Sequence, residues 1–217
     1  MAHSFGYDFP NRNKTHDTKL SEFFSNVIPI QEDRYFLLRY LTDALCKNLS
    51  DYLIILVGGG GNKMILIKLL EKVFGEYFAS IGGRNFANWP SDMNVKSARL
   101  LSTTPKKMIM SSYKSKNPMN SLFMKFIARV NHNNFKSHSA VIVLCDVMPK
   151  IDNLTPGINK TVRVINLSEK HNEINNYCDD EINRLLDVWK SDLISLLINY
   201  CCKKNKTKND EFKNINF

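Results

Sequence analysis

The chain has 217 residues, of which 43% are hydrophobic and 24% are charged, and this balance excludes a largely disordered protein and favours one sizeable folded domain. The formal net charge of +9 at pH 7 permits binding to nucleic acid or another polyanion, although an ordinary basic surface explains it equally well. No stretch has the apolar length of a secretory signal or a membrane span, so we expect a soluble protein inside a cell, with no membrane partner.

The five cysteines are scattered along the chain and form no Cys-x-x-Cys pair. This distribution argues against a disulfide framework and a zinc site, and it fits a reducing compartment. Cys201 and Cys202 close a predicted amphipathic helix, and we expect them to be packing or surface thiols. His132 and His138 lie in a polar loop without further ligands at the spacing of zinc sites, so we predict no metal held by histidine.

The segment before the first predicted strand divides into an arm and two helices. Residues 1–17 are polar and rich in turn formers, and we expect an extended arm there. Residues 18–50 carry apolar side chains at helical spacing on either side of Pro29, which predicts an N-terminal helical segment of two helices.

The stretch 51–75 has the layout of a phosphate-binding P-loop. The apolar run 52–57 predicts a strand, four glycines predict a tight loop, and a helix-period run follows Lys63. Glycines let backbone N–H groups turn toward an anion, a helix N-terminus adds partial positive charge, and a lysine reaches the terminal phosphates. The alternative is a flexible glycine turn without a ligand. The predicted nucleotide-binding residues are Gly58, Gly59, Gly60, Gly61, Asn62, Lys63 and Met64.

This motif departs from the pattern GxxxxGK[ST]. With Lys63 as the motif lysine, the first glycine falls on Val57, the second on Asn62 and the Mg²⁺-binding hydroxyl on Met64. A thioether is a poor ligand for Mg²⁺, which prefers oxygen. The order of strand, glycine loop, lysine and helix therefore predicts a nucleotide site. The residues at the motif positions predict that this site is weakened.

The rest of the chain alternates strand and helix patterns. Strands are predicted at 78–81, 107–111, 140–145 and 162–167, and helices at 119–130 and 180–201. This order predicts an α/β fold, a three-layer core with a mainly parallel sheet, over residues 51–170. A C-terminal helical segment at 171–202 and a basic tail at 203–217 complete the chain. The tail lysines are either solvated or in non-specific contact with nucleic acid.

Six stretches follow one another in the order of a single known family. They are FGYDF, KLSEFFSNVIPIQEDRYFLLRYLTDALC, LIKLLEKVFGEYFASI, SARLLSTTPKKMIM, VIVLCDVMPKIDN with GINKTVRVI, and DVWKSDLISLLINY. In this order the chain resembles the superfamily-three helicase domain of the poxvirus and giant-virus primase-helicases, which are AAA+-like P-loop NTPases.

The resemblance implies an activity and partners. It implies an ATP- and Mg²⁺-dependent DNA helicase of viral DNA replication that binds single-stranded or forked DNA. It also implies a hexameric ring or a replication partner such as a primase. The implied location of the protein is the host cytoplasm or a viral replication site. The connection 128–139 is short for the DNA-pushing hairpin of that family but basic, so we predict DNA contacts at Arg129, His132 and Lys136.

The resemblance also assigns catalytic positions, and most carry unsuitable residues. The acid after the second strand falls on Tyr113, the polar sensor on Asp146, and the arginine finger near Lys160 and Arg163. A neutral phenol cannot act as base or metal ligand, and a lysine is a weak substitute for arginine's two-pronged guanidinium. We therefore expect a degenerate copy with impaired or no ATP hydrolysis. The alternatives are a non-enzymatic pseudo-helicase scaffold that binds DNA or protein, and a decayed remnant without activity.

Overall fold

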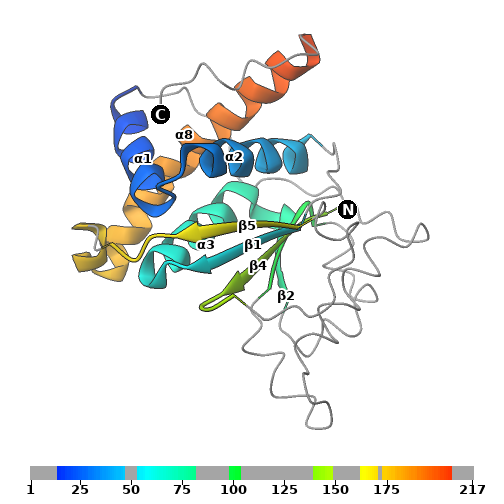
Figure 1. Ribbon diagram of the computed structural model, residues 1–217. Helices are drawn as coiled ribbons and strands as arrows, with labels where there is room; N and C mark the ends of the chain where they lie inside the picture. The colour runs from blue at the N-terminus through cyan, green and yellow to red at the C-terminus, as the bar shows by residue number, and fades with distance from the viewer. Residues whose placement is uncertain are drawn as a thin grey trace, which may run out of the picture.

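The computed structural model describes residues 14–46, 53–81, 98–103, 139–148, 162–170 and 173–206 (Figure 1). Within these residues, none of the helices combines the length and apolar character that a membrane span requires. The elements in chain order are α1 (Lys14–Val27), α2 (Gln31–Leu45), β1 (Leu53–Gly58), α3 (Gly60–Phe74), the short 3-10 helix η1 (Gly75–Tyr77), β2 (Phe78–Ile81), β3 (Leu100–Thr103), β4 (Ala140–Cys145), β5 (Val162–Leu167), η3 (Glu173–Asn176) and α8 (Asp179–Lys206).

The described strands form one parallel sheet of five strands in the order β2-β3-β4-β1-β5. Every residue of β4 is buried, as are the first four residues of β1. Alternate residues of a strand point to opposite faces, so this central pair is buried on both faces. The predicted α/β fold with a mainly parallel sheet is therefore confirmed, and double burial explains why β1 and β4 read as continuous apolar runs.

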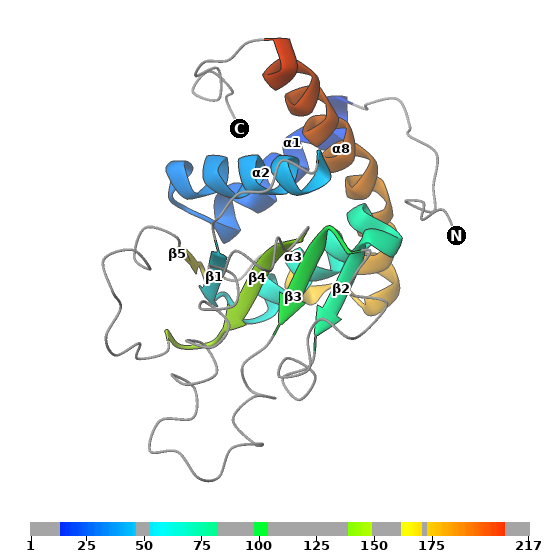
Figure 2. The same cartoon turned by 90° about the vertical axis from the view of Figure 1, so that its right-hand side faces the viewer.

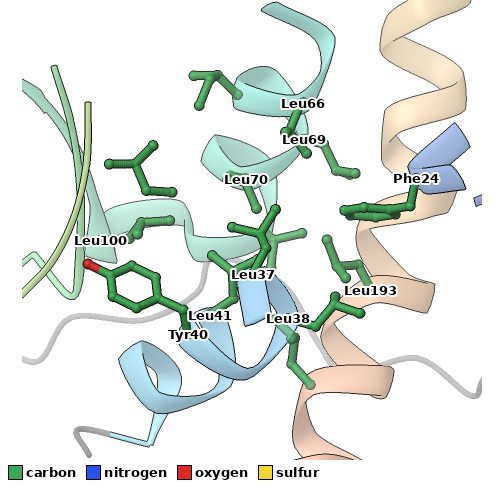
Figure 3. Close-up of a cluster of buried hydrophobic side chains, with 14 of the residues drawn as sticks. Phe24, Leu37, Leu38, Tyr40, Leu41, Leu66, Leu69, Leu70, Leu100 and Leu193 are labelled. Carbon is green, nitrogen blue, oxygen red and sulfur yellow. The ribbon is translucent and has the colours of Figure 1, made fainter. Parts of the chain in front are cut away.

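The described helices cover one face of the sheet. Figure 2 shows α1, α2 and α8 on one side of the strands, and Figure 3 shows side chains of α1, α2, α3 and α8 meeting above the sheet. In that cluster Leu41 of α2, Leu70 of α3 and Leu193 of α8 are fully buried. Each such side chain contributes about 1.5–3 kcal/mol when it is removed from water. The first and last described helices, α1 and α8, therefore stabilise the same core as α3.

Two predicted boundaries differ from the structure. α1 begins at Lys14, inside the predicted arm, and α8 continues to Lys206, beyond the predicted end of the helical segment. The predicted strand 107–111 and the predicted helix 119–130 lie outside the described residues and stay predictions. β3, between β2 and β4, is a strand that the sequence does not predict. Two of the four residues of β3 carry hydroxyls, so local hydrophobicity did not reveal it, and its pairing with both neighbours defines it.

A disulfide joins the carboxyl end of α2 to α8. Cys46 and Cys201 are bonded, with their Cα atoms 6.6 Å apart. The prediction that Cys201 is a packing or surface thiol is therefore wrong. The two cysteines are 155 residues apart in sequence, so spacing gave no indication, and they meet because α2 packs against α8. Cys145 and Cys178 are free, the first buried and the second exposed.

Tyr40 connects α2 to the start of β4. Its buried hydroxyl donates a hydrogen bond to the Val141 carbonyl oxygen (2.9 Å) and accepts one from the Val141 N–H (2.6 Å). Burial raises the pKa of Tyr40 above its ordinary value, so the hydroxyl stays protonated and keeps donating at any pH at which the protein is handled.

We expect Tyr40→Phe to lower the free energy of unfolding by about 2 kcal/mol, because two buried backbone groups lose their partner. Tyr35→Phe is the matched control, since the Tyr35 hydroxyl accepts an exposed hydrogen bond from Gln31 (2.7 Å), and we expect a change below about 0.5 kcal/mol. Urea denaturation measures both variants. Equal losses in the two variants would contradict the role assigned to the Tyr40 hydroxyl.

Candidate phosphate-binding site

The glycine loop joins β1 to α3 at the carboxyl end of the sheet. β1 ends at Gly58 and α3 begins at Gly60, so a single residue separates strand from helix. Gly58, Gly59 and Gly60 have φ angles of +75°, +80° and +44°, which residues with a side chain rarely adopt. The backbone conformation therefore requires glycine at these positions, whether or not the loop binds a ligand.

The end of β5 closes one side of this loop. A Cβ atom on Gly59 would lie 2.6 Å from the Leu167 Cβ, whereas a Cβ atom on Gly60 would meet nothing within 4 Å. Asn62, which occupies the position of the motif's second glycine, donates from Nδ2 to the carbonyl oxygens of Ser168 (3.1 Å) and Lys170 (3.0 Å). Asn62 therefore fastens the first turn of α3 to the segment that follows β5. The sequence predicts Asn62 as a ligand-binding residue and gives no sign of this clamp.

Lys63 lies in the first turn of α3 and is buried, with 5% of its surface exposed. Its ammonium group donates to Asp146 Oδ1 (2.7 Å) and to the Cys145 carbonyl oxygen (3.0 Å). The structure thus brings together the predicted motif lysine and the predicted sensor residue. Burial raises the pKa of Cys145 to about 11, while the nearby Lys63 charge lowers it and Asp146 raises it. The Cys145 thiol is therefore protonated at neutral pH and is not a nucleophile for this site.

The first turn of α3 supplies further attraction for an anion. The first N–H groups of a helix have no partner within the helix, and the helix dipole places partial positive charge there. No acidic residue lies in this turn. A phosphate group at this end of α3 would meet backbone N–H groups and the ammonium of Lys63, which is the chemistry of a P-loop.

The described residues do not fit the Mg²⁺ ion that the family resemblance implies. Met64 stands at the hydroxyl position, with 52% of its surface exposed. Of the part of the chain that the structure describes, no group of three His, Cys, Asp or Glu side chains is placed to hold a metal ion. Two carboxylates of the described residues lie near the loop. Asp146 forms an ion pair with Lys63, and the Oε1 atom of Glu169 would lie 3.8 Å from a Cβ atom on Gly58. The donors at hand favour binding an anion directly rather than through a magnesium ion.

Within the described residues, β3, the strand before β4, carries no acid at its end. β3 ends with Ser102 and Thr103, and Thr103 is in register with Val143 on β4. Neither residue type carries a charge that would activate water or hold a metal. Tyr113, the predicted occupant of the acid position, lies outside the described residues, as do Lys160, Arg129, His132 and Lys136.

Arg163 lies at the amino end of β5, in register with Ile54 on β1, and so at the opposite end of the strands from the glycine loop. Its guanidinium donates twice to Asp33 Oδ1, from Nη2 (2.5 Å) and from Nε (3.1 Å), and lies over the ring of Phe36. These contacts connect β5 to α2. A role for Arg163 as an arginine finger stays a prediction, and it requires release from Asp33.

Among solved structures, those of the C-terminal region of NrS-1 have a similar fold. Three apo structures of that region superpose with TM-scores of 0.64, 0.63 and 0.58, each at 12% sequence identity, and cover 91%, 89% and 89% of this chain. The chain spans about half of each of those chains, namely 48%, 49% and 47%. No protein-family model matches the sequence, and no curated protein does. Fold and site together define an α/β protein with a P-loop-like core.

We expect Gly59→Ala to lower the free energy of unfolding by about 3 kcal/mol, because the strained φ angle and the contact with Leu167 add. Gly60→Ala is the control: its φ angle is also positive but its surroundings are open, so we expect a loss of about 1 kcal/mol. Chemical denaturation of both variants measures the difference. If the two variants lose the same free energy of unfolding, β5 does not close the loop as described.

Proposed function

We propose that this chain is a superfamily-three helicase-like module that binds the phosphates of ATP, or of another polyphosphate, at Gly58–Lys63 and hydrolyses them slowly or not at all. One observation carries the proposal. Lys63 places a buried ammonium group at the carboxyl ends of β1 and β4, beside three glycines whose φ angles are positive. A lysine, a helix N-terminus and a glycine turn at one point suit a phosphate better than any other common ligand.

Two observations support a helicase-like origin in viral DNA replication. The collinear resemblance runs from the amino-terminal arm to the last helix, and the fold is shared with the NrS-1 C-terminal region over 91% of this chain. The net charge of +9 suits a protein whose partner is nucleic acid. Arg129, His132 and Lys136 remain the proposed DNA contacts. A hexameric ring and a primase partner remain proposals that rest on the family resemblance.

The residues favour binding over hydrolysis. Lys63 and the N–H groups of α3 neutralise and orient phosphate charge. Met64 takes the place of the hydroxyl, β3 ends in the uncharged residues Ser102 and Thr103, and the neutral Tyr113 is predicted at the position of the acid. Removing such an acid commonly costs several orders of magnitude in rate, because preorganised charge supplies much of the acceleration. ATP is therefore proposed as a ligand, and Mg²⁺ is not required to hold it.

A non-enzymatic scaffold is the second candidate. The observation that favours it is the ion pair between Lys63 and Asp146, which engages the lysine within the protein itself. A sensitive phosphate-release assay with single-stranded DNA tests the scaffold. Turnover that disappears in Lys63→Ala identifies an ATPase and excludes the scaffold.

The proposal predicts that a fluorescent ATP analogue binds the wild-type protein with a dissociation constant below about 1 mM, in buffer containing EDTA, and that Lys63→Ala weakens binding at least about tenfold. Lys68→Ala is the matched control, because Lys68 lies on the same helix and makes an exposed ion pair with Asp179 (3.4 Å). That variant should bind as the wild type does. Absence of binding at millimolar nucleotide, or equal weakening in both variants, would refute the nucleotide site.

A further inference from the structure

The ammonium group of Lys63 already holds a carboxylate at the place where a phosphate is expected. It lies 2.7 Å from Asp146 Oδ1, and it also donates to the Cys145 carbonyl oxygen. An ammonium group has three N–H donors, so the end of β4 engages two of them. The lysine side chain is 7% exposed and the Asp146 side chain 54% exposed. The lysine is therefore buried, whereas about half of the Asp146 side chain is exposed to solvent.

We propose that Asp146 is a specificity-determining residue of the phosphate site, which acts as an internal competitor for Lys63. This inference rests on the proposed function. A phosphate that enters the loop either displaces the carboxylate from the ammonium or shares the ammonium with it. Displacement costs the ion pair, and sharing brings two anions together on one cation. In both cases the affinity for phosphate falls because of the charge on Asp146.

The cost of sharing depends on the charge of the ligand. Coulomb repulsion grows in proportion to charge, so a nucleoside triphosphate suffers more from Asp146 than inorganic phosphate does. An asparagine at this position would keep a carbonyl oxygen for Lys63 and would remove the charge. Asp146 therefore lowers the affinity for a highly charged polyphosphate more than it lowers the affinity for inorganic phosphate.

The chain offers a matched control for this carboxylate. Asp187 forms an ion pair with Lys72, another lysine of α3, at 2.8 Å, and the Asp187 side chain is 55% exposed. The hydrogen bond from Lys72 is the largest cause that lowers the pKa of Asp187, so this ion pair stabilises the charged form of the carboxylate. Lys72 lies in the last turn of α3, far along the helix from Lys63. Asp187→Asn thus removes a comparable ion pair of an α3 lysine, together with the longer contact between Asp187 and Lys190 (3.7 Å), without touching the phosphate site.

The test is isothermal titration calorimetry of wild type, Asp146→Asn, Asp187→Asn and the double variant Lys63→Ala/Asp146→Asn, with ATP and with inorganic phosphate in metal-free buffer. We expect Asp146→Asn to bind ATP about tenfold more tightly than wild type, with a smaller gain for inorganic phosphate. Asp187→Asn should match wild type, and the double variant should not bind. Thermal unfolding of each variant confirms that it is folded.

The outcomes separate this inference from the proposed function. Binding by wild type that requires Lys63 but does not tighten in Asp146→Asn overturns the inference alone. Failure of both wild type and Asp146→Asn to bind overturns both. Repeating the titration with Mg²⁺ tests the opposite role: if Mg²⁺ tightens ATP binding to wild type and not to Asp146→Asn, the carboxylate holds a metal ion and the inference is wrong.

Discussion

The parallel pairing of β1 with β4 is the constraint on which the candidate site depends. Val57 and Cys145 are in register, so the two strands end at the same level of the sheet. Gly58 continues β1 into the loop, and Asp146 follows β4 directly. Lys63, in the first turn of α3, therefore contacts the end of β4. A shift in this register would separate the lysine from both of its acceptors.

Two independent demands act on the glycine loop. The positive φ angles and the contact between Gly59 and Leu167 require glycine for folding alone, whether or not an anion binds. Asn62 adds a structural clamp at a position where the motif has glycine. The loop's composition therefore does not establish phosphate binding. Lys63 carries that argument, because its ammonium group lies at the carboxyl ends of β1 and β4. Asp146 compensates the cost of burying that ammonium group.

The sequence predicts the parts of the fold that local pattern determines. The apolar runs of β1 and β4 and the helical spacing in α2 and α8 are such patterns, and the structure confirms these elements. β3 was missed because its position depends on pairing with two neighbours, and its Ser102 is polar yet buried. The Cys46–Cys201 bond was missed because residues so distant in sequence meet only through the packing of α2 on α8. In the candidate site, the sequence predicted Lys63 and Asp146 individually, and only the sheet register brings them together.

A crystal structure of the protein grown with ATP in metal-free solution tests the central claim most directly. The account predicts a phosphate group bonded to Lys63 Nζ and to the first N–H groups of α3, with the Asp146 carboxylate turned away from the ammonium. A phosphate bound elsewhere, or a Lys63–Asp146 pair that persists while the nucleotide is absent from the loop, would contradict it.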